Sequence, residues 1–152
     1  MADRSPAVKA ADVREAALRL LARREHSLVE LRRKLAQKGW PDDLIDSELA
    51  ALAEAGLQSD QRYAESYVRS RAAKAYGPVR IRAELGERGI DRSLIEFAFR
   101  ELEADWFSIA AAWYQRRYGD RAPADFKEKS RRQQALARRG FDHALTRELV
   151  DG

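Results

Sequence analysis

The sequence contains no cysteine, only four prolines and few of the β-branched residues threonine, valine and isoleucine. Without cysteine it has neither a disulfide framework nor a thiolate metal site, which is consistent with a reducing compartment. The shortage of β-branched residues, set against abundant alanine and arginine, favours helix over sheet. No stretch alternates usefully with the period of two that marks a half-buried strand. We therefore expect an all-α protein.

Long apolar stretches are also absent. None reaches the roughly 18 consecutive apolar residues of a membrane span, and the first residues lack the apolar core of a secretory signal. We expect a cytoplasmic protein that does not contact a membrane. Its 152 residues are enough for one domain with a real core. The net charge of +4 indicates a polyanion or an acidic partner without deciding between them.

Recognisable catalytic patterns are missing as well. His26 and His143 lie near opposite ends and lack the i, i+4 partner of a helical zinc site. Neither a phosphate-binding loop nor a Gly-x-Ser-x-Gly nucleophile turn occurs. The acidic pair Asp42-Asp43 is better explained by the start of a helix. We expect no enzyme, no metal and no cofactor.

Three glycines recur at intervals of 50 and 51 residues, and their surroundings recur with them. A basic residue precedes each glycine, and apolar residues stand at fixed distances from it. This agreement in register predicts a threefold repeat. The matching positions are Gly39, Gly89 and Gly140; Lys38, Arg88 and Arg139 directly before; Leu35, Leu85 and Leu136 four before; Trp40, Ile90 and Phe141 directly after; and Leu44, Leu94 and Leu145 five after.

Each repeat is expected to contain three helices. A longer helix comes first, over about 12–24, 60–75 and 105–117. A second helix ends at the repeat glycine, opened by a Ser27-x-x-Glu30 capping box in the first repeat and by Gly77-Pro78 in the second. A third follows, with start signals at Pro41, Asp91 and Asp142. The prediction is an elongated array of about nine helices: an N-terminal tail (1–10), then repeats 11–55, 56–103 and 104–152. The tryptophans Trp40, Trp106 and Trp113 are interpreted as packing residues.

Basic residues concentrate in the middle repeat. Arg62 and Arg69 share a helix face, while Arg80 follows the Gly77-Pro78 break, so guanidinium groups of two helices are expected beside Tyr76. Clustered arginine suits phosphates or carboxylates, and Tyr76 near a turn could stack on a base. The alternative is a solvated face in which Glu65 pairs with Arg69. The candidate binding residues here are Arg62, Arg69, Arg71, Lys74, Tyr76, Arg80, Arg82 and Arg88.

A second basic stretch runs from the end of the third long helix into the last repeat. It either extends the same surface or only solvates this repeat, and its first members, Arg116 and Arg117, join the candidate binding residues. The stretch comprises Arg116, Arg117, Arg121, Lys127, Lys129, Arg131, Arg132, Arg138 and Arg139, diluted by Asp120, Asp125 and Glu128.

The middle repeat resembles the signature of the RecX family of recombination regulators. The matching residues run from Asp60 through Arg62-Tyr63-Ala64, Tyr67-Val68-Arg69 and Tyr76-Gly77-Pro78 to Arg88-Gly89-Ile90, and 27–39 resembles the family's first repeat. The third repeat matches more loosely, with Arg132 and Gln133 where the others carry apolar or basic residues.

This resemblance implies a non-enzymatic regulator that binds the RecA filament on single-stranded DNA. No strong apolar stripe is left over for dimerisation once the core is assigned, so we expect a monomer. Such proteins are thought to lie in the filament groove and to suppress ATP hydrolysis, strand exchange and stimulated LexA cleavage, and therefore to modulate repair and the SOS response. Weak direct DNA binding is compatible with this role. The hypothesis is that Arg62, Arg69, Arg71, Arg80 and Arg82 form the central contact, aided by Lys74 and Tyr76.

Two other functions stay open from the residues alone. Paired short helices resemble the helix-turn-helix of duplex DNA-binding transcription regulators, although asparagine and glutamine suited to reading bases are scarce on the second helices. A helical-repeat scaffold that binds only proteins is the other possibility, and its binding would be insensitive to salt.

Overall fold

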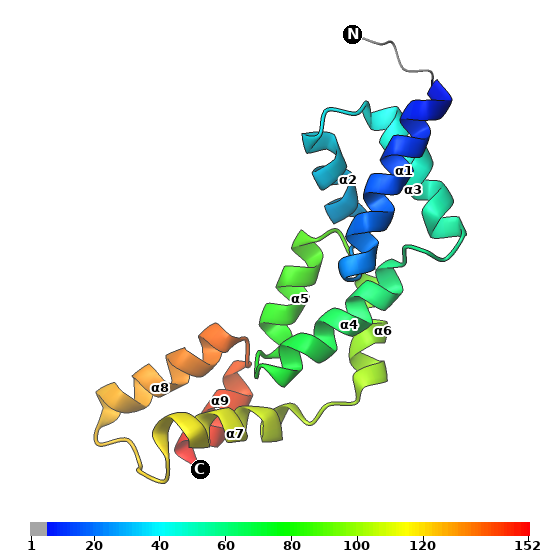
Figure 1. Cartoon of the computed structure of the whole chain (residues 1–152). Coiled ribbons are helices and arrows are strands. Elements are labelled where there is room, and N and C mark those ends of the chain that lie inside the picture. Colours follow the sequence, from blue (N-terminus) through cyan, green and yellow to red (C-terminus); the bar gives the residue numbers. More distant parts are fainter. Residues whose placement is uncertain (1–5) are drawn as a thin grey trace.

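The computed structural model describes residues 6–152, and every regular element in that range is an α-helix. This confirms the all-α prediction. Figure 1 shows the helices following one another along an elongated array. They are α1 (Pro6–Arg23), α2 (Leu28–Gln37), α3 (Asp42–Glu54), α4 (Asp60–Ala73), α5 (Pro78–Glu87), α6 (Arg92–Leu102), α7 (Trp106–Tyr118), α8 (Phe126–Arg139) and α9 (His143–Asp151).

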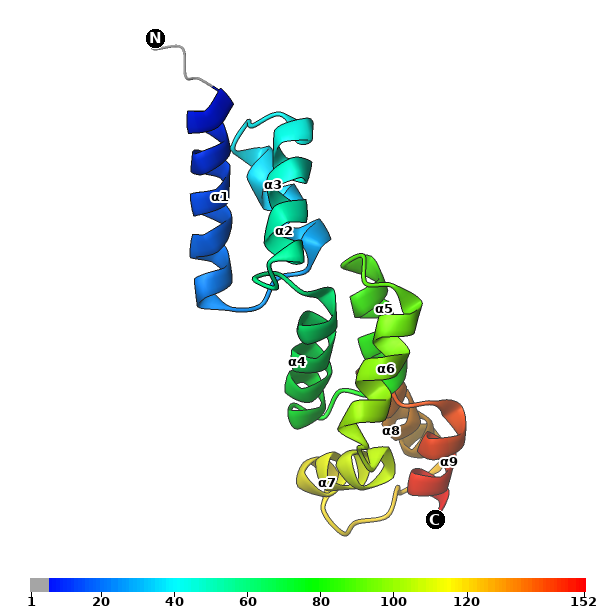
Figure 2. The same ribbon diagram turned by 90° about the vertical axis from the view of Figure 1, so that its right-hand side faces the viewer.

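The helices form three groups of three, which confirms the predicted repeat (Figures 1 and 2). In each group the third helix packs against both the first and the second: α3 on α1 and α2, α6 on α4 and α5, α9 on α7 and α8. Each group encloses its own apolar core. The equivalent leucines Leu35, Leu85 and Leu136 are fully buried, one in each core. Within residues 6–152 no helix is long and apolar enough to cross a membrane.

Most helix boundaries follow the local signals in the sequence. Ser27 caps α2 with a complete capping box, in which its side chain accepts from Glu30 N and the Glu30 carboxylate accepts from Ser27 N. Pro78 occupies the first turn of α5. Asp91 and Asp142 cap α6 and α9 through their carboxylates.

The N-terminus differs from the prediction. Helix α1 begins at Pro6 rather than near Asp12, so residues 6–10, expected as part of a tail, are helical. Alanine-rich sequence explains the extension, because alanine has the highest helix propensity. Residues 1–5 of the expected tail lie outside the described residues.

The repeat glycines allow neighbouring repeats to approach closely. Gly89 has φ +77°, and a Cβ there would lie 2.2 Å from Cγ2 of Val29 in the first repeat. A Cβ on Gly140 (φ +104°) would lie 2.7 Å from the backbone nitrogen of Arg80. Gly39 in the first repeat also has a positive φ, +91°. A Cβ there would meet no atom within 4 Å. The glycine therefore serves helix termination in all three repeats and inter-repeat contact in two of them.

The third repeat departs from the others in its core. Leu31 and Ile81 are fully buried, and the equivalent Arg132 is also buried, with only 3% of its surface exposed. Its guanidinium donates to the Tyr114 hydroxyl at 2.9 Å and to the Arg121 carbonyl at 2.8 Å. It also pairs with the Glu128 carboxylate at 2.7 Å. These bonds compensate for the burial of the charge and connect α7, the following loop and α8.

The tryptophans pack as predicted. Trp40 lies against the first core, Trp113 against the third, and Trp106 against both the second and the third. Trp106 also contacts Phe99 with ring centroids 5.7 Å apart. Trp106 therefore helps to join α7 to the end of the second repeat.

Candidate functional site

Three guanidinium groups surround the ring of Tyr76 where the second and third repeats meet. Those of Arg71, Arg139 and Arg80 lie 3.7, 4.1 and 4.6 Å from its centroid. Arg71 lies in the last turn of α4 and Arg80 in the first turn of α5, so the predicted meeting of two helices beside Tyr76 occurs. Arg139 comes from α8 and was not anticipated in this cluster. The ring already contacts cations in the free chain, which leaves less of it available for stacking on a base.

Backbone hydrogen bonds hold this junction together. Gly77 N donates to the Arg139 carbonyl at 2.7 Å, and Val79 N donates to the Gly140 carbonyl at 2.9 Å. The Arg139 side chain donates to the carbonyls of Ala75 and Lys74, at the C-terminal end of α4. The Arg139 side chain thus stabilises the junction between the repeats. Through Arg139 the second basic stretch contacts the middle repeat.

Glu84 neutralises part of the predicted arginine cluster. Its carboxylate accepts two hydrogen bonds from Arg71, at 3.1 and 3.0 Å, and both side chains are only 19% exposed. Arg80 approaches the same carboxylate at 3.6 Å. Partly buried bidentate pairs of this kind are stronger than surface pairs. Glu84 therefore holds Arg71 and Arg80 in place, a role that the number of charges in the sequence did not predict.

Two other predicted arginines are paired at the surface. Arg62 bonds Glu25 across the first junction at 3.0 Å. Arg82 makes a bidentate pair with Glu96 on α6, at 2.9 and 3.0 Å. The repeat itself contained the signal for this pair, since Arg32 and Asp46 form the equivalent pair fifty residues earlier.

Arg69 and Arg116 have no ion-pair partner among residues 6–152, and both are exposed. They line one hollow of about 420 Å³ between α4 and α7, whose floor includes Leu102 and Ile109. The alternative pairing of Arg69 with Glu65 is not formed within residues 6–152, where Glu65 accepts a hydrogen bond from Gln61 at 3.4 Å. Lys74 and Arg117 are likewise exposed and without an acidic partner in the described chain.

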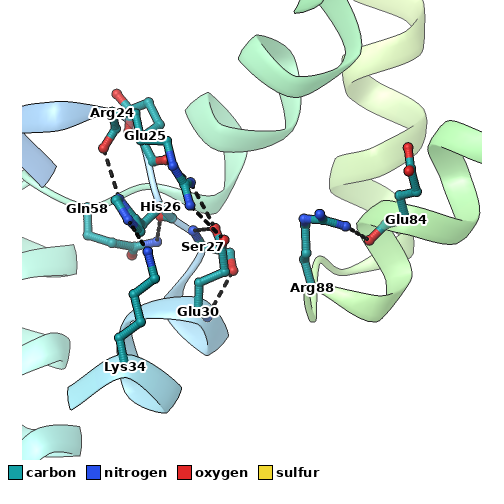
Figure 3. Close-up of polar contacts among 9 residues, drawn as sticks. All are labelled: Arg24, Glu25, His26, Ser27, Glu30, Lys34, Gln58, Glu84 and Arg88. Carbon is teal, nitrogen blue, oxygen red and sulfur yellow. Dashed lines mark hydrogen bonds and ion pairs between the residues drawn. The ribbon is translucent and has the colours of Figure 1, made fainter. Parts of the chain in front are cut away.

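Figure 3 shows the junction between the first and second repeats, with Arg24, Glu25 and Glu30 on one side and Arg88 on the other. Arg24 pairs with Glu30 at 3.1 Å. Arg88 donates to the Glu84 carbonyl and lies 4.9 Å from the Tyr67 ring centroid. These groups line a cleft of about 340 Å³.

His26 is buried at this junction in its neutral form. Its Nε2 lies 3.1 Å from Lys34 Nζ, and its Nδ1 lies 3.0 Å from the Arg24 carbonyl (Figure 3). Because an ammonium only donates, Nε2 must accept and Nδ1 must carry the proton. Burial lowers the pKa of His26, and the nearby Arg24 and Lys34 charges add to this effect. Gln58 donates to the His26 carbonyl and connects the two repeats.

Tyr63 beneath the same cleft is unable to ionise near neutral pH. Burial and the neighbouring Glu30 carboxylate raise the pKa of Tyr63 to about 12. His26 and Tyr63 thus supply packing and hydrogen bonds at this junction. Among residues 6–152 no group of three or more histidine, aspartate or glutamate side chains is arranged to hold a metal ion.

Comparison with known proteins agrees with the repeat. The family models for the first, second and third three-helix domains of RecX match residues 14–52, 59–98 and 103–150. The chain is 49% identical over 140 residues to the regulatory protein RecX of Ectopseudomonas mendocina (strain ymp), covering 92% of this chain and 93% of that protein. It is 46% identical to the regulatory protein RecX of Pseudomonas entomophila (strain L48), covering 92% and 90%.

Solved structures show the same fold. A crystal structure of RecX from Lactobacillus salivarius superposes with a TM-score of 0.78 at 24% identity, covering 95% of this chain and 96% of that one. Another crystal structure of regulatory protein RecX gives a TM-score of 0.80 at 25% identity, covering 97% and 74%. With three family domains in order and close relatives matched along nearly their whole length, this chain belongs to the RecX family of regulatory proteins.

Proposed function

We propose that this protein is a negative regulator of RecA. It binds the RecA filament on single-stranded DNA and inhibits ATP hydrolysis, strand exchange and co-protease activity, and so restrains recombination, repair and the SOS response in the cytoplasm. The observation that carries the proposal is the match of all three repeats, in order, to a family of regulators. The array's length supports it, because an elongated binder can contact successive subunits of a filament.

The unpaired cations where the middle and third repeats meet support a contact with acidic groups. Arg69 and Arg116 share one hollow and are available to phosphate or carboxylate, as is the exposed Lys74. Arg62 and Arg82 are about half exposed in their ion pairs. Pairs this exposed stabilise a protein by only about 0–1 kcal/mol, so a partner's anion can replace Glu25 or Glu96 at little cost. Arg71 and Arg80 act chiefly by keeping the junction rigid.

The decisive experiment measures the DNA-dependent ATPase rate of RecA from the same organism, with this protein present well below the RecA concentration. We expect strong inhibition, because a regulator acting on a growing filament affects many subunits. A duplex-binding transcription regulator or an unrelated scaffold protein predicts an unchanged rate. An unchanged rate, with RecA filaments shown to be present, would overturn the proposal.

The contact surface is tested by charge reversal at Arg69. We expect Arg69→Glu to weaken inhibition at least about tenfold, as removal of a charged contact from an interface typically does. Arg33→Glu is the matched control, because Arg33 is also exposed and unpaired in the described chain but lies on the first repeat. Equal inhibition by both variants would remove Arg69 from the proposed contact.

A further inference from the structure

A second unpaired basic surface lies in the third repeat, beside the end of α7 and along α8. A groove of about 690 Å³ runs between the end of α7 and α8. Four of the cations that line it make no ion pair within residues 6–152: Arg117, Lys127, Arg131 and Arg138. The carboxylates in its lining are both engaged, since Glu128 pairs with Arg132 and Asp125 caps α8. The groove is therefore strongly positive.

Comparison of the repeats explains why this charge is uncompensated. Arg131 occupies the position of Arg80, whose carboxylate partner is Glu84 four residues later. The equivalent of Glu84 in the third repeat is Ala135, which also lines the groove. The acid that neutralises the middle repeat is thus absent here.

The cations form a line. Arg131 and Arg138 follow Lys127 by four and eleven residues, which is close to one and three helical turns. The three side chains therefore share one face of α8. At a rise of about 1.5 Å per residue the line is about 16 Å long. Arg117 extends it from α7, where its guanidinium lies 5.6 Å from the Trp113 ring centroid and 5.8 Å from that of Tyr118. A linear array of charges matches a linear polyanion better than a single small anion.

A buried donor lies in the wall of the same groove. Arg132 lines it, is 3% exposed, and its Nε has no hydrogen-bond partner. Because this atom is itself buried, Arg132 shapes the groove wall rather than contacting a ligand.

We propose that the α7–α8 groove binds the sugar-phosphate backbone of single-stranded nucleic acid. Arg117, Lys127, Arg131 and Arg138 contact successive phosphates, as in other proteins whose basic grooves follow a strand. This inference deepens the proposed function, because the filament would supply the strand. It assigns the nucleic-acid contact to the third repeat and leaves the Arg69 hollow for the protein partner.

The test is fluorescence anisotropy of a labelled oligothymidylate with the full chain over a range of salt concentrations. The triple variant Lys127→Gln, Arg131→Gln, Arg138→Gln is compared with Arg23→Gln, Arg33→Gln, Lys38→Gln, which loses the same charge from exposed positions of the first repeat. Each lost phosphate contact lowers the slope of log K against log salt by about 0.7. We expect the groove variant to lose about 2 in slope and at least about tenfold in affinity, and the control to change little.

Two results overturn this assignment. Unchanged binding by the groove variant removes the groove, and an equal loss in both variants shows a general charge effect. If the groove variant keeps its oligothymidylate affinity but no longer inhibits the ATPase, the groove contacts protein instead. Circular dichroism confirms that each variant is folded. Because direct binding is measured without RecA, its failure leaves the ATPase result of the proposed function intact.

Discussion

Replacing Gly89 with alanine tests how closely the first two repeats must pack. The backbone at Gly89 has φ +77°, which costs a residue with a side chain about 1–2 kcal/mol. The new Cβ would also lie 2.2 Å from Cγ2 and 2.9 Å from Cβ of Val29, and overpacking typically costs about 1–3 kcal/mol. We therefore expect Gly89→Ala to lower the free energy of unfolding by about 2–5 kcal/mol.

Gly39→Ala is the internal control for this prediction. Gly39 has a comparable φ of +91°, but a Cβ added there would meet no neighbouring atom, so it should show only the backbone cost of about 1–2 kcal/mol. Val29→Ala removes both Cγ atoms from the contact and should restore part of the loss when combined with Gly89→Ala. The difference between the glycine variants thus isolates the contact between repeats.

Urea unfolding followed by circular dichroism measures these energies, with the denaturant slope as a check that the unfolding reaction is unchanged. The reasoning is refuted if Gly89→Ala and Gly39→Ala lose equal stability, or if Val29→Ala and Gly89→Ala are simply additive. Either result would mean that the repeats separate slightly at no cost and that the close approach is not required.

Three further interactions are tested by the same unfolding assay. Arg132→Ala should cost about 2–4 kcal/mol through the cavity it leaves, and Arg132→Leu should cost less because leucine fills more of that cavity, although both lose the bonds to Tyr114 and Arg121; equal losses would contradict this. His26 binds a proton less readily when folded than when unfolded, so stability should fall as the pH drops below about 6.5, and His26→Gln should flatten that dependence. Glu84→Gln should cost about 1–3 kcal/mol through its partly buried bonds to Arg71, and the exposed Asp46→Asn should cost less; a reversed order would refute the ranking.

The repeat and its helices were predictable because their signals are local. The glycine that ends a helix, the capping box at Ser27 and the proline that opens α5 act through neighbouring backbone groups. The position of such a signal in the sequence therefore gives the position of the helix end in the structure. The start of α1 was misjudged, although Pro6 at its first position is the same signal that Pro78 gives for α5.

The binding residues were harder to predict because the availability of a charge depends on contacts between distant segments. Arg62 is paired with Glu25, and Arg80 bonds a carbonyl of Arg138 in the next repeat. Counting basic and acidic residues within one stretch detects neither. Tyr76 was correctly placed beside two helices, yet the third cation at its ring comes from Arg139, sixty-three residues away in the sequence.

Alignment of the repeats against one another recovers much of what charge counting misses. Arg32 with Asp46 and Arg82 with Glu96 are the same ion pair in successive repeats, and the equivalent positions of the third repeat hold Gln133 and Arg147. The position of Glu84 is likewise taken by Ala135. A repeat that keeps its fold while losing its internal acidic partners gains unpaired positive charge that folding does not require. That difference between structurally equivalent positions, rather than the number of arginines, distinguishes the third repeat as the binding surface for a polyanion.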